Sequence, residues 1–143
     1  MQLQKVLIKD IMIPEPYTID VHEDFAVAWD IFRLRKIRHL PILINDRLLT
    51  GILTLSDLYR TISPKKTRTG TLIYDVKQLN SFKLEEVMTS KVYTLSPEDY
   101  MGKAIDLMVE HSCGCLPIVN ETNYLEGIVT RGQVMKVAAK HFA

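Results

Sequence analysis

The chain repeats itself after 76 residues, and this internal repeat restricts its fold more than any other feature of the sequence. The two copies stay in one register from end to end. The matching positions are Met12 and Met88, Thr18 and Thr94, Ala28 and Ala104, Leu40-Pro41-Ile42 and Leu116-Pro117-Ile118, and Gly51-Ile52 and Gly127-Ile128. A repeat of this size is a supersecondary unit that cannot bury its apolar face alone. We therefore expect two like units that pack together with pseudo-two-fold symmetry, and a function located in the seam between them.

Each copy has the pattern of a β-α-β-β-α unit, which gives an α/β (α+β) fold class. Apolar residues at i, i+3 and i+4, such as Ala28, Ile31 and Phe32, predict a helix in the middle of the copy. Two apolar runs joined by a polar turn follow it and predict a hairpin. The other predicted elements are short amphipathic turns at Ile8–Met12 and Leu84–Met88, extended segments at Tyr17–Val21 and Val92–Leu95, and closing helices at about Ser56–Ile62 and Gly132–His141.

The repeat divides the chain into repeat one at 1–62, a connector at 63–82 and repeat two at 83–143. The connector contains Pro64, Gly70 and a basic cluster, with a few ordered residues expected around Leu72–Val76. The basic cluster consists of Lys65, Lys66 and Arg68. Long loops are often functional or mobile, and here plain connection is the simpler interpretation.

Composition and charge limit the possible partners. The chain is 47% hydrophobic and 24% charged, as expected for a globular domain. Its 18 basic and 17 acidic side chains give a net charge of +1, which provides no general attraction to nucleic acid or to an anionic membrane. Lys5, Lys9 and Asp10 interrupt the N-terminal region, and no apolar run approaches the roughly 20 residues that span a bilayer. We therefore expect a cytoplasmic protein without a membrane partner.

The two cysteines predict neither a disulfide nor a metal site. Cys113 and Cys115 lie two positions apart, a separation that does not favour a disulfide between them. With His111 they offer three soft ligands, but a zinc site needs suitable spacing, and no fourth ligand is evident. Cys113 corresponds to Ile37 in the other copy, so packing as a small hydrophobe is the simpler interpretation.

In both copies a helix is followed by Leu-Pro-Ile, then by Gly-Ile-(Leu/Val)-Thr and a last helix, with Asp57 three residues after Thr54. This pattern resembles a tandem pair of CBS domains, the regulatory module named after cystathionine beta-synthase, over essentially the whole chain except the connector. The resemblance implies a Bateman module, similar to small stand-alone bacterial or archaeal members of the family that include proteins associated with acetoin utilisation. In such modules, three-stranded sheets face each other, two clefts bind adenosine-type ligands in many members, and two modules pair into a flat homodimer.

Thr54 and Asp57 allow two interpretations at the start of the closing helix. The carboxylate can accept two hydrogen bonds from a ribose diol, while free backbone N–H groups face a phosphate. The same residues also match a capping box, in which they satisfy the N–H groups of their own helix. In repeat two, Thr130 and Gln133 keep a predicted capping box without the carboxylate. We therefore predict unequal clefts, with one dominant site at Asp57.

By the resemblance, each cleft combines residues of both repeats. The dominant cleft is expected to contain His39, Ile52, Thr54, Asp57, Thr89, Val92, Cys113 and Gly114. The weaker cleft is expected to contain Thr18, Ile37, Arg38, Cys115, Thr130 and Arg131. Arg38 or His39 either contacts a phosphate or, like neighbouring cations, forms a solvated helix end that the helix dipole stabilises.

Catalysis is the least supported class of function, because the sequence has no recognisable nucleophile arrangement, Gly-rich phosphate loop or paired catalytic carboxylates. We predict no enzyme, no catalytic residue and no required cofactor. The leading hypothesis is a regulatory module that senses an adenine nucleotide (AMP, ADP or ATP), S-adenosylmethionine or NAD. An oligomerisation or partner-docking module with empty clefts is the alternative. Nucleic-acid binding through the basic cluster ranks third, and the sequence does not name a regulated protein partner.

Overall fold

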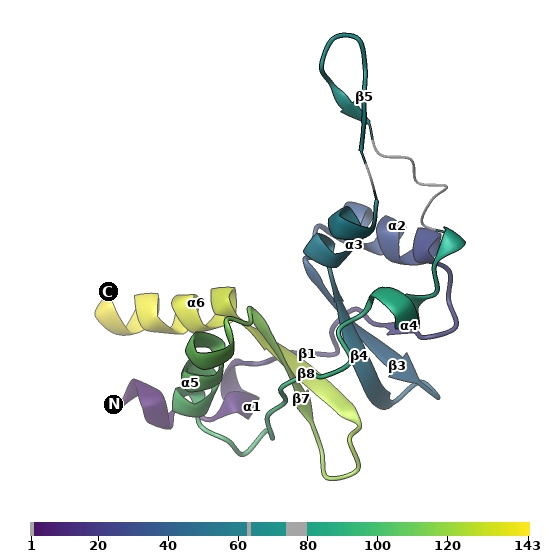
Figure 1. The fold of residues 1–143 in the computed structure, drawn as a ribbon. Coiled ribbons are helices and arrows are strands. Elements are labelled where there is room, and N and C mark those ends of the chain that lie inside the picture. The colour runs from purple at the N-terminus through teal and green to yellow at the C-terminus, as the bar shows by residue number, and fades with distance from the viewer. Residues whose placement is uncertain (1, 63, 74–79) are drawn as a thin grey trace. The chain divides into compact units, whose positions relative to one another are not determined.

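The computed structural model describes residues 2–62, 64–73 and 80–143. Its contacts divide the chain into two compact units (Figure 1). Unit 1 consists of Met1–Pro16, Arg47–Leu49 and Val92–Ala143, and unit 2 consists of Tyr17–Asp46 and Thr50–Lys91. No helix among the described residues is long and apolar enough to cross a membrane.

Unit 2 is built on a sheet with the strand order β2-β3-β4, in which β2 runs parallel to β3. Its elements are β2 (Ile19–Asp20), α2 (Phe25–Arg35), β3 (His39–Ile44), β4 (Leu48–Thr54), α3 (Leu55–Thr61) and α4 (Leu84–Val87). Helix α2 buries Phe25, Ala28 and Phe32, which lie on one face because their spacing follows the helical period. These side chains pack into one core cluster with Leu40, Ile42, Leu53 and Leu58 from the strands and α3.

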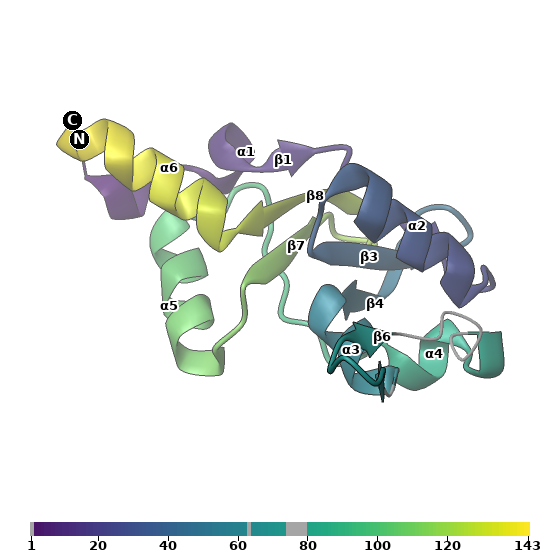
Figure 2. The same cartoon turned by 90° about the horizontal axis from the view of Figure 1, so that it is seen from above.

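Unit 1 has the sheet order β1-β8-β7, and β8 is antiparallel to both of its neighbours. Its elements are η1 (Leu3–Lys5), α1 (Ile8–Ile11), β1 (Ile13–Pro14), α5 (Met101–His111), β7 (Cys115–Val119), β8 (Leu125–Thr130) and α6 (Arg131–Phe142). Figure 2 shows α5 and α6 next to each other, as their contacts confirm. The core contains Ile8, Ala104, Leu116, Ile118 and Val129.

The strand pairings follow the same 76-residue offset as the sequence. Ile19 pairs in parallel with Ile42, and Leu95 pairs in parallel with Ile118. Thr89 pairs antiparallel with Ile52, as Ile13 pairs with Ile128. Helices α2 and α5 also end alike, because Lys36 and Ser112 both adopt a left-handed conformation with a φ of 53°. The predicted helices and hairpins therefore occur in both copies, in equivalent positions.

The compact units do not coincide with the sequence copies 1–62 and 83–143. The first 16 residues, with α1 and β1, belong to unit 1 together with most of the second copy. Helix α4 and Thr89, from the start of the second copy, belong to unit 2. Each unit is thus completed by a segment from the start of the other copy. These exchanged segments are the residues up to Pro16, which join unit 1, and the residues from α4 to Lys91, which join unit 2. The repeat pattern alone does not indicate this exchange.

The repeated Met and Gly positions form one close contact in each unit. An added Cβ at Gly51 would lie 2.5 Å from Sδ of Met88 and 2.9 Å from the carbonyl oxygen of Thr89. At Gly127 it would lie 2.7 Å from the Ile13 carbonyl oxygen and 2.9 Å from Sδ of Met12. The absence of a side chain at Gly51 and Gly127 lets the neighbouring segment approach β4 in unit 2 and β8 in unit 1.

The described part of the connector contains a hairpin rather than a plain loop. Strand β5 (Lys65–Lys66) pairs antiparallel with β6 (Leu72–Ile73), and Gly70 has a φ of 86° in the turn. Figure 1 shows this hairpin standing away from α2 and α3 of the same unit. The ordered residues expected at Leu72 and Ile73 are in β6, and residues 74–76 lie outside the described part of the chain.

Candidate ligand-binding site

The start of α3 is a complete capping box, as the second interpretation of the sequence predicted. The Asp57 N–H donates to Oγ1 of Thr54 at 3.0 Å, and the Thr54 N–H donates to Oδ2 of Asp57 at 2.9 Å. These bonds satisfy backbone donors that the helix itself leaves without a partner. Asp57 is only 5% exposed and is the buried charged residue of the described core. Its capping role does not exclude a ligand, because each carboxylate oxygen has two lone pairs.

The second carboxylate oxygen of Asp57 accepts a hydrogen bond from the guanidinium of Arg60, one turn along α3. The Nε–H of Arg60 also donates to the Ser56 carbonyl oxygen at 3.4 Å. Arg60 is 74% exposed at its side chain, whereas Asp57 is buried. The guanidinium therefore lies between the buried carboxylate and solvent.

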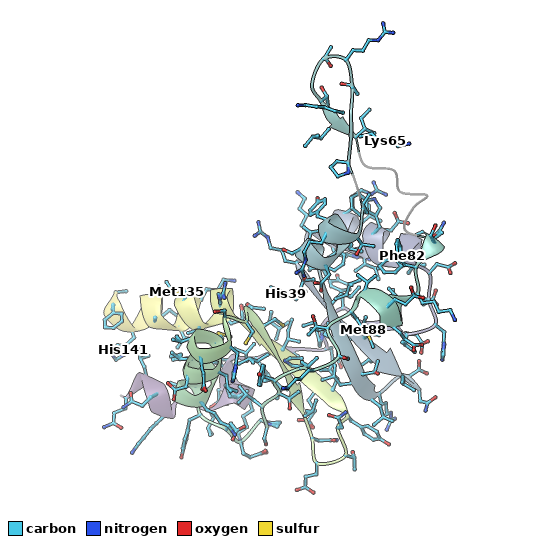
Figure 3. The ribbon with its side chains drawn as sticks, viewed as in Figure 1. His39, Lys65, Phe82, Met88, Met135 and His141 are labelled. Carbon is cyan, nitrogen blue, oxygen red and sulfur yellow. The ribbon has the colours of Figure 1, made fainter. Side chains whose placement is uncertain are left out.

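An open hollow of about 610 Å³ adjoins this ion pair within unit 2. It is lined by Asp57, Arg60, Thr61, Phe82, Glu86, Val87 and Thr89. Figure 3 labels Phe82, which precedes α4, and Met88, which follows it. Backbone hydrogen bonds of 3.0 and 2.9 Å join Ile52 to Thr89 in both directions. The structure thus brings together Ile52, Thr54, Asp57 and Thr89 of the predicted dominant cleft.

The start of β3 is tied to the same helix start. The Leu55 N–H donates to the Arg38 carbonyl oxygen at 3.0 Å, which places the backbone before His39 next to the Thr54 cap. In unit 1 the Arg131 N–H donates to the Gly114 carbonyl oxygen at 3.1 Å, the equivalent bond. Arg33, in the last turn of α2, is exposed and pairs with Asp30 at 3.1 Å.

The predicted clefts draw residues from both units. In unit 2 lie His39, Ile52, Thr54, Asp57 and Thr89 of the dominant cleft and Thr18, Ile37 and Arg38 of the weaker one. In unit 1 lie Val92, Cys113 and Gly114 of the dominant cleft and Cys115, Thr130 and Arg131 of the weaker one. That the two sets of residues join in shared clefts remains a prediction.

The prediction of a second complete capping box is wrong. Thr130 Oγ1 accepts from the Gln133 N–H at 3.2 Å, but the Gln133 side chain does not return to the cap. Its Nε2 donates instead to the Ile11 carbonyl oxygen at 3.2 Å, at the end of α1. A helix leaves its last carbonyl groups without partners, and an amide can donate to one of them whereas a carboxylate cannot.

Cys115 is buried and Cys113 is half-buried. Burial, with a smaller effect from Cys113, raises the pKa of the Cys115 thiol to about 12. The Cys113 thiol donates to the Leu107 carbonyl oxygen at 3.7 Å. His111 stacks on Tyr93 with ring centroids 3.7 Å apart. Within the described ranges, no group of three or more His, Cys, Asp or Glu side chains is placed to bind a metal ion.

Sequence reasoning missed Arg60, Phe82 and Glu86 in the hollow. Arg60 had a readable signal, since a cation three residues after Asp57 lies on the same helix face. Phe82 and Glu86 had none, because their place depends on the exchanged segment.

Comparison with known proteins gives a consistent family. The CBS domain model matches residues 8–64 and 84–140. The uncharacterized protein MJ1426 of Methanocaldococcus jannaschii is 32% identical over 92% of this chain and 90% of its own length. The homoserine O-acetyltransferase of Methanohalobium evestigatum is 27% identical over 94% of this chain, which spans only 24% of that enzyme.

Two solved structures show the same fold. The CBS domain pair of protein MJ0100, in complex with 5'-methylthioadenosine and S-adenosyl-L-methionine, has a TM-score of 0.79 at 23% identity and covers 96% of this chain and 98% of its own. CBSX2 in complex with AMP has a TM-score of 0.79 at 20% identity, covering 96% and 99%. The matched repeats and the shared fold place this chain in the CBS domain family, with two CBS domains in tandem.

Proposed function

We propose that this chain is a regulatory module that senses an adenosyl ligand, and that the buried carboxylate of Asp57 holds the ligand's ribose. The observation that carries this proposal is the placement of Asp57 and Thr89 on one open hollow beside Ile52 and Thr54. A buried carboxylate at the edge of a hollow can accept hydrogen bonds from a ribose diol, and such bonds are stronger in a partly buried site than in water. Similar CBS domain pairs hold AMP, 5'-methylthioadenosine or S-adenosylmethionine, which supports an adenosyl ligand as the class.

The dominant cleft would add Val92, Cys113 and Gly114 to these residues of unit 2, with backbone groups and apolar side chains on either side of the adenine. Candidate ligands are AMP, ADP, ATP, NAD and S-adenosylmethionine. The weaker cleft would combine Thr18, Ile37 and Arg38 with Cys115, Thr130 and Arg131. Its ribose position would be poorer, since Gln133 has no carboxylate and its amide is engaged by Ile11.

An oligomerisation module is the second candidate function, and one observation favours it. An open groove of about 430 Å³ between α5 and α6 is lined by Ile105, Met108, Val109, Val134 and Met135, with Ser112 and Arg131. Val109 and Met135 are 76% and 67% exposed, and Met135 is labelled in Figure 3. Apolar area of this kind is typical of a contact with another protein surface, and a second copy fits the family's paired modules. A homodimer is compatible with ligand binding.

Asp57→Asn tests the proposed function. Asn keeps an oxygen for the Thr54 N–H but loses the charge, and hydrogen bonds to charged groups contribute about 1.5 to 3 kcal/mol against about 1 for neutral pairs. We expect roughly tenfold weaker binding of the tightest ligand in a calorimetric panel of AMP, ADP, ATP, NAD and S-adenosylmethionine.

Asp99→Asn is the matched control. Asp99 also accepts a backbone N–H near a helix start, from Ser96 at 2.8 Å, and pairs with Lys103. It lies outside the predicted clefts, so ligand affinity should not change. Unchanged affinity in Asp57→Asn, or two equivalent sites per chain, would mean that Thr54 and Asp57 only cap α3.

A further inference from the structure

We propose that Arg60 sets the module's selectivity between phosphorylated and uncharged adenosyl ligands, an inference that rests on the ribose site at Asp57. The starting point is a competition for one carboxylate. Oδ2 of Asp57 holds the Thr54 N–H, and Oδ1 holds the guanidinium of Arg60. A ribose diol that binds Asp57 must therefore displace the Arg60 guanidinium from Oδ1 or share that oxygen with it.

The exposure of the two partners indicates which one moves. Asp57 is fixed in the capping box and is 5% exposed, so moving its carboxylate would disrupt the start of α3. The Arg60 side chain is 74% exposed and extends back from the last turn of α3. A ligand can shift the guanidinium without unfolding any element. In the absence of a ligand, Arg60 therefore acts as a cover over Asp57.

The fate of the displaced guanidinium depends on the charge of the ligand. Arg60, Thr61 and Thr89 line the same hollow as Asp57, so the guanidinium remains next to any group bound there. A phosphate on the ligand can accept bidentate hydrogen bonds from the Arg60 guanidinium and so replace the lost Asp57 carboxylate as its anionic partner. An uncharged nucleoside offers no such partner. Glu86 on the hollow's wall is the alternative anion for Arg60 in that case.

The second repeat lacks this arrangement. Lys136 stands where Arg60 stands in the first repeat, and Gln133 replaces Asp57. Gln133 carries no charge for Lys136 to pair with, and its amide donates to Ile11. We therefore expect a displaced cation to contribute to the selectivity between phosphorylated and uncharged ligands at the start of α3 and not at the start of α6.

The test compares AMP with adenosine in parent, Arg60→Gln and Arg60→Lys proteins by calorimetry at fixed pH and ionic strength. Removal of the Arg60 cation should tighten adenosine binding about two- to fivefold, the range for losing a partly exposed ion pair. AMP binding should stay equal or weaken, so the dissociation constant of adenosine divided by that of AMP should fall at least about twofold. Arg60→Lys should retain part of the preference for AMP, because the cation remains.

Arg33→Gln is the matched control, since Arg33 forms an exposed ion pair with Asp30 at the same i, i+3 spacing in α2. It should leave both affinities unchanged. A parent protein that binds none of adenosine, AMP, ADP, ATP, NAD and S-adenosylmethionine overturns the proposed function together with this selectivity. A parent that binds one of the other ligands but neither AMP nor adenosine overturns only the selectivity. A parent that binds, with an unchanged AMP-to-adenosine ratio in Arg60→Gln, overturns only the role of Arg60. Equal weakening of both ligands would assign Arg60 a purely structural role.

Discussion

Replacing Gly51 with Ala should destabilise unit 2 by a clash that the structure defines atom by atom. The new Cβ would lie 2.5 Å from Met88 Sδ and 2.9 Å from the Thr89 carbonyl oxygen. The methionine side chain is flexible and can move away. The carbonyl cannot move as easily, because two backbone hydrogen bonds of 2.9 and 3.0 Å hold Thr89 against Ile52.

The expected magnitude combines two opposite effects. Overpacking of this kind costs about 1 to 3 kcal/mol. Replacing Gly with Ala also restricts the unfolded chain, which returns about 0.4 to 1 kcal/mol. These ranges combine to a net loss in the free energy of unfolding of about 1.3 kcal/mol and at most about 2.6 kcal/mol. The middle value corresponds to roughly 3 to 5 °C in Tm for a chain of this size.

Thermal and urea unfolding followed by circular dichroism measures this loss. Gly127→Ala should behave like Gly51→Ala, because its Cβ would lie 2.7 Å from the Ile13 carbonyl oxygen. Gly132→Ala is the control: it lies in the first turn of α6, and its nearest neighbour would be Thr130 Oγ1 at 3.5 Å. That variant should gain stability, since Ala favours a helix over Gly by about 1 kcal/mol. An equally stable Gly51→Ala protein would refute the close approach of the exchanged segment.

Two further predictions concern the Cys115 thiol and the α5–α6 groove. Because burial raises the Cys115 pKa from 9.0 to about 12, the unfolded chain releases that proton first. The free energy of unfolding should therefore fall as pH rises from 9 towards 12, by at most about 1.4 kcal/mol per pH unit, and less steeply in Cys115→Ala. Rapid alkylation of Cys115 in the folded protein at pH 8 would contradict its burial. Val109→Glu should convert the expected homodimer to a monomer in light scattering at tens of micromolar, while Glu110→Gln should not. A monomeric parent would exclude the homodimer.

The sequence predicts local structure well wherever the cause is local. The helix over Phe25–Arg35, the hairpins and the Thr54 cap follow from periodicity, turn residues and a four-residue capping pattern. The sequence does not show which copy β1 or the segment around Thr89 pairs with, because each copy offers an equivalent strand, β4 or β8. A repeat pattern says which segments are alike, and long-range packing decides which copy each one joins.

The same limit explains the error at Gln133. Glutamine suits a capping box by type, so the local pattern favoured that geometry. The amide turned to Ile11 because the exchanged segment places the end of α1 within reach. Arg60 belongs to the opposite class, since its pairing with Asp57 needs only one helical turn and could be read from the spacing.

The exchange of segments also orders events during synthesis of the chain. Unit 2 needs nothing beyond Lys91, so all its strands and helices are available once that residue has been made. Ile13 of β1 pairs with Ile128, so β1 is synthesised well before its partner strand β8. Strand β1 is therefore among the last elements to be fixed in place, and closing unit 1 requires contacts of long sequence separation, such as Ile13 with Ile128 and Ile11 with Gln133.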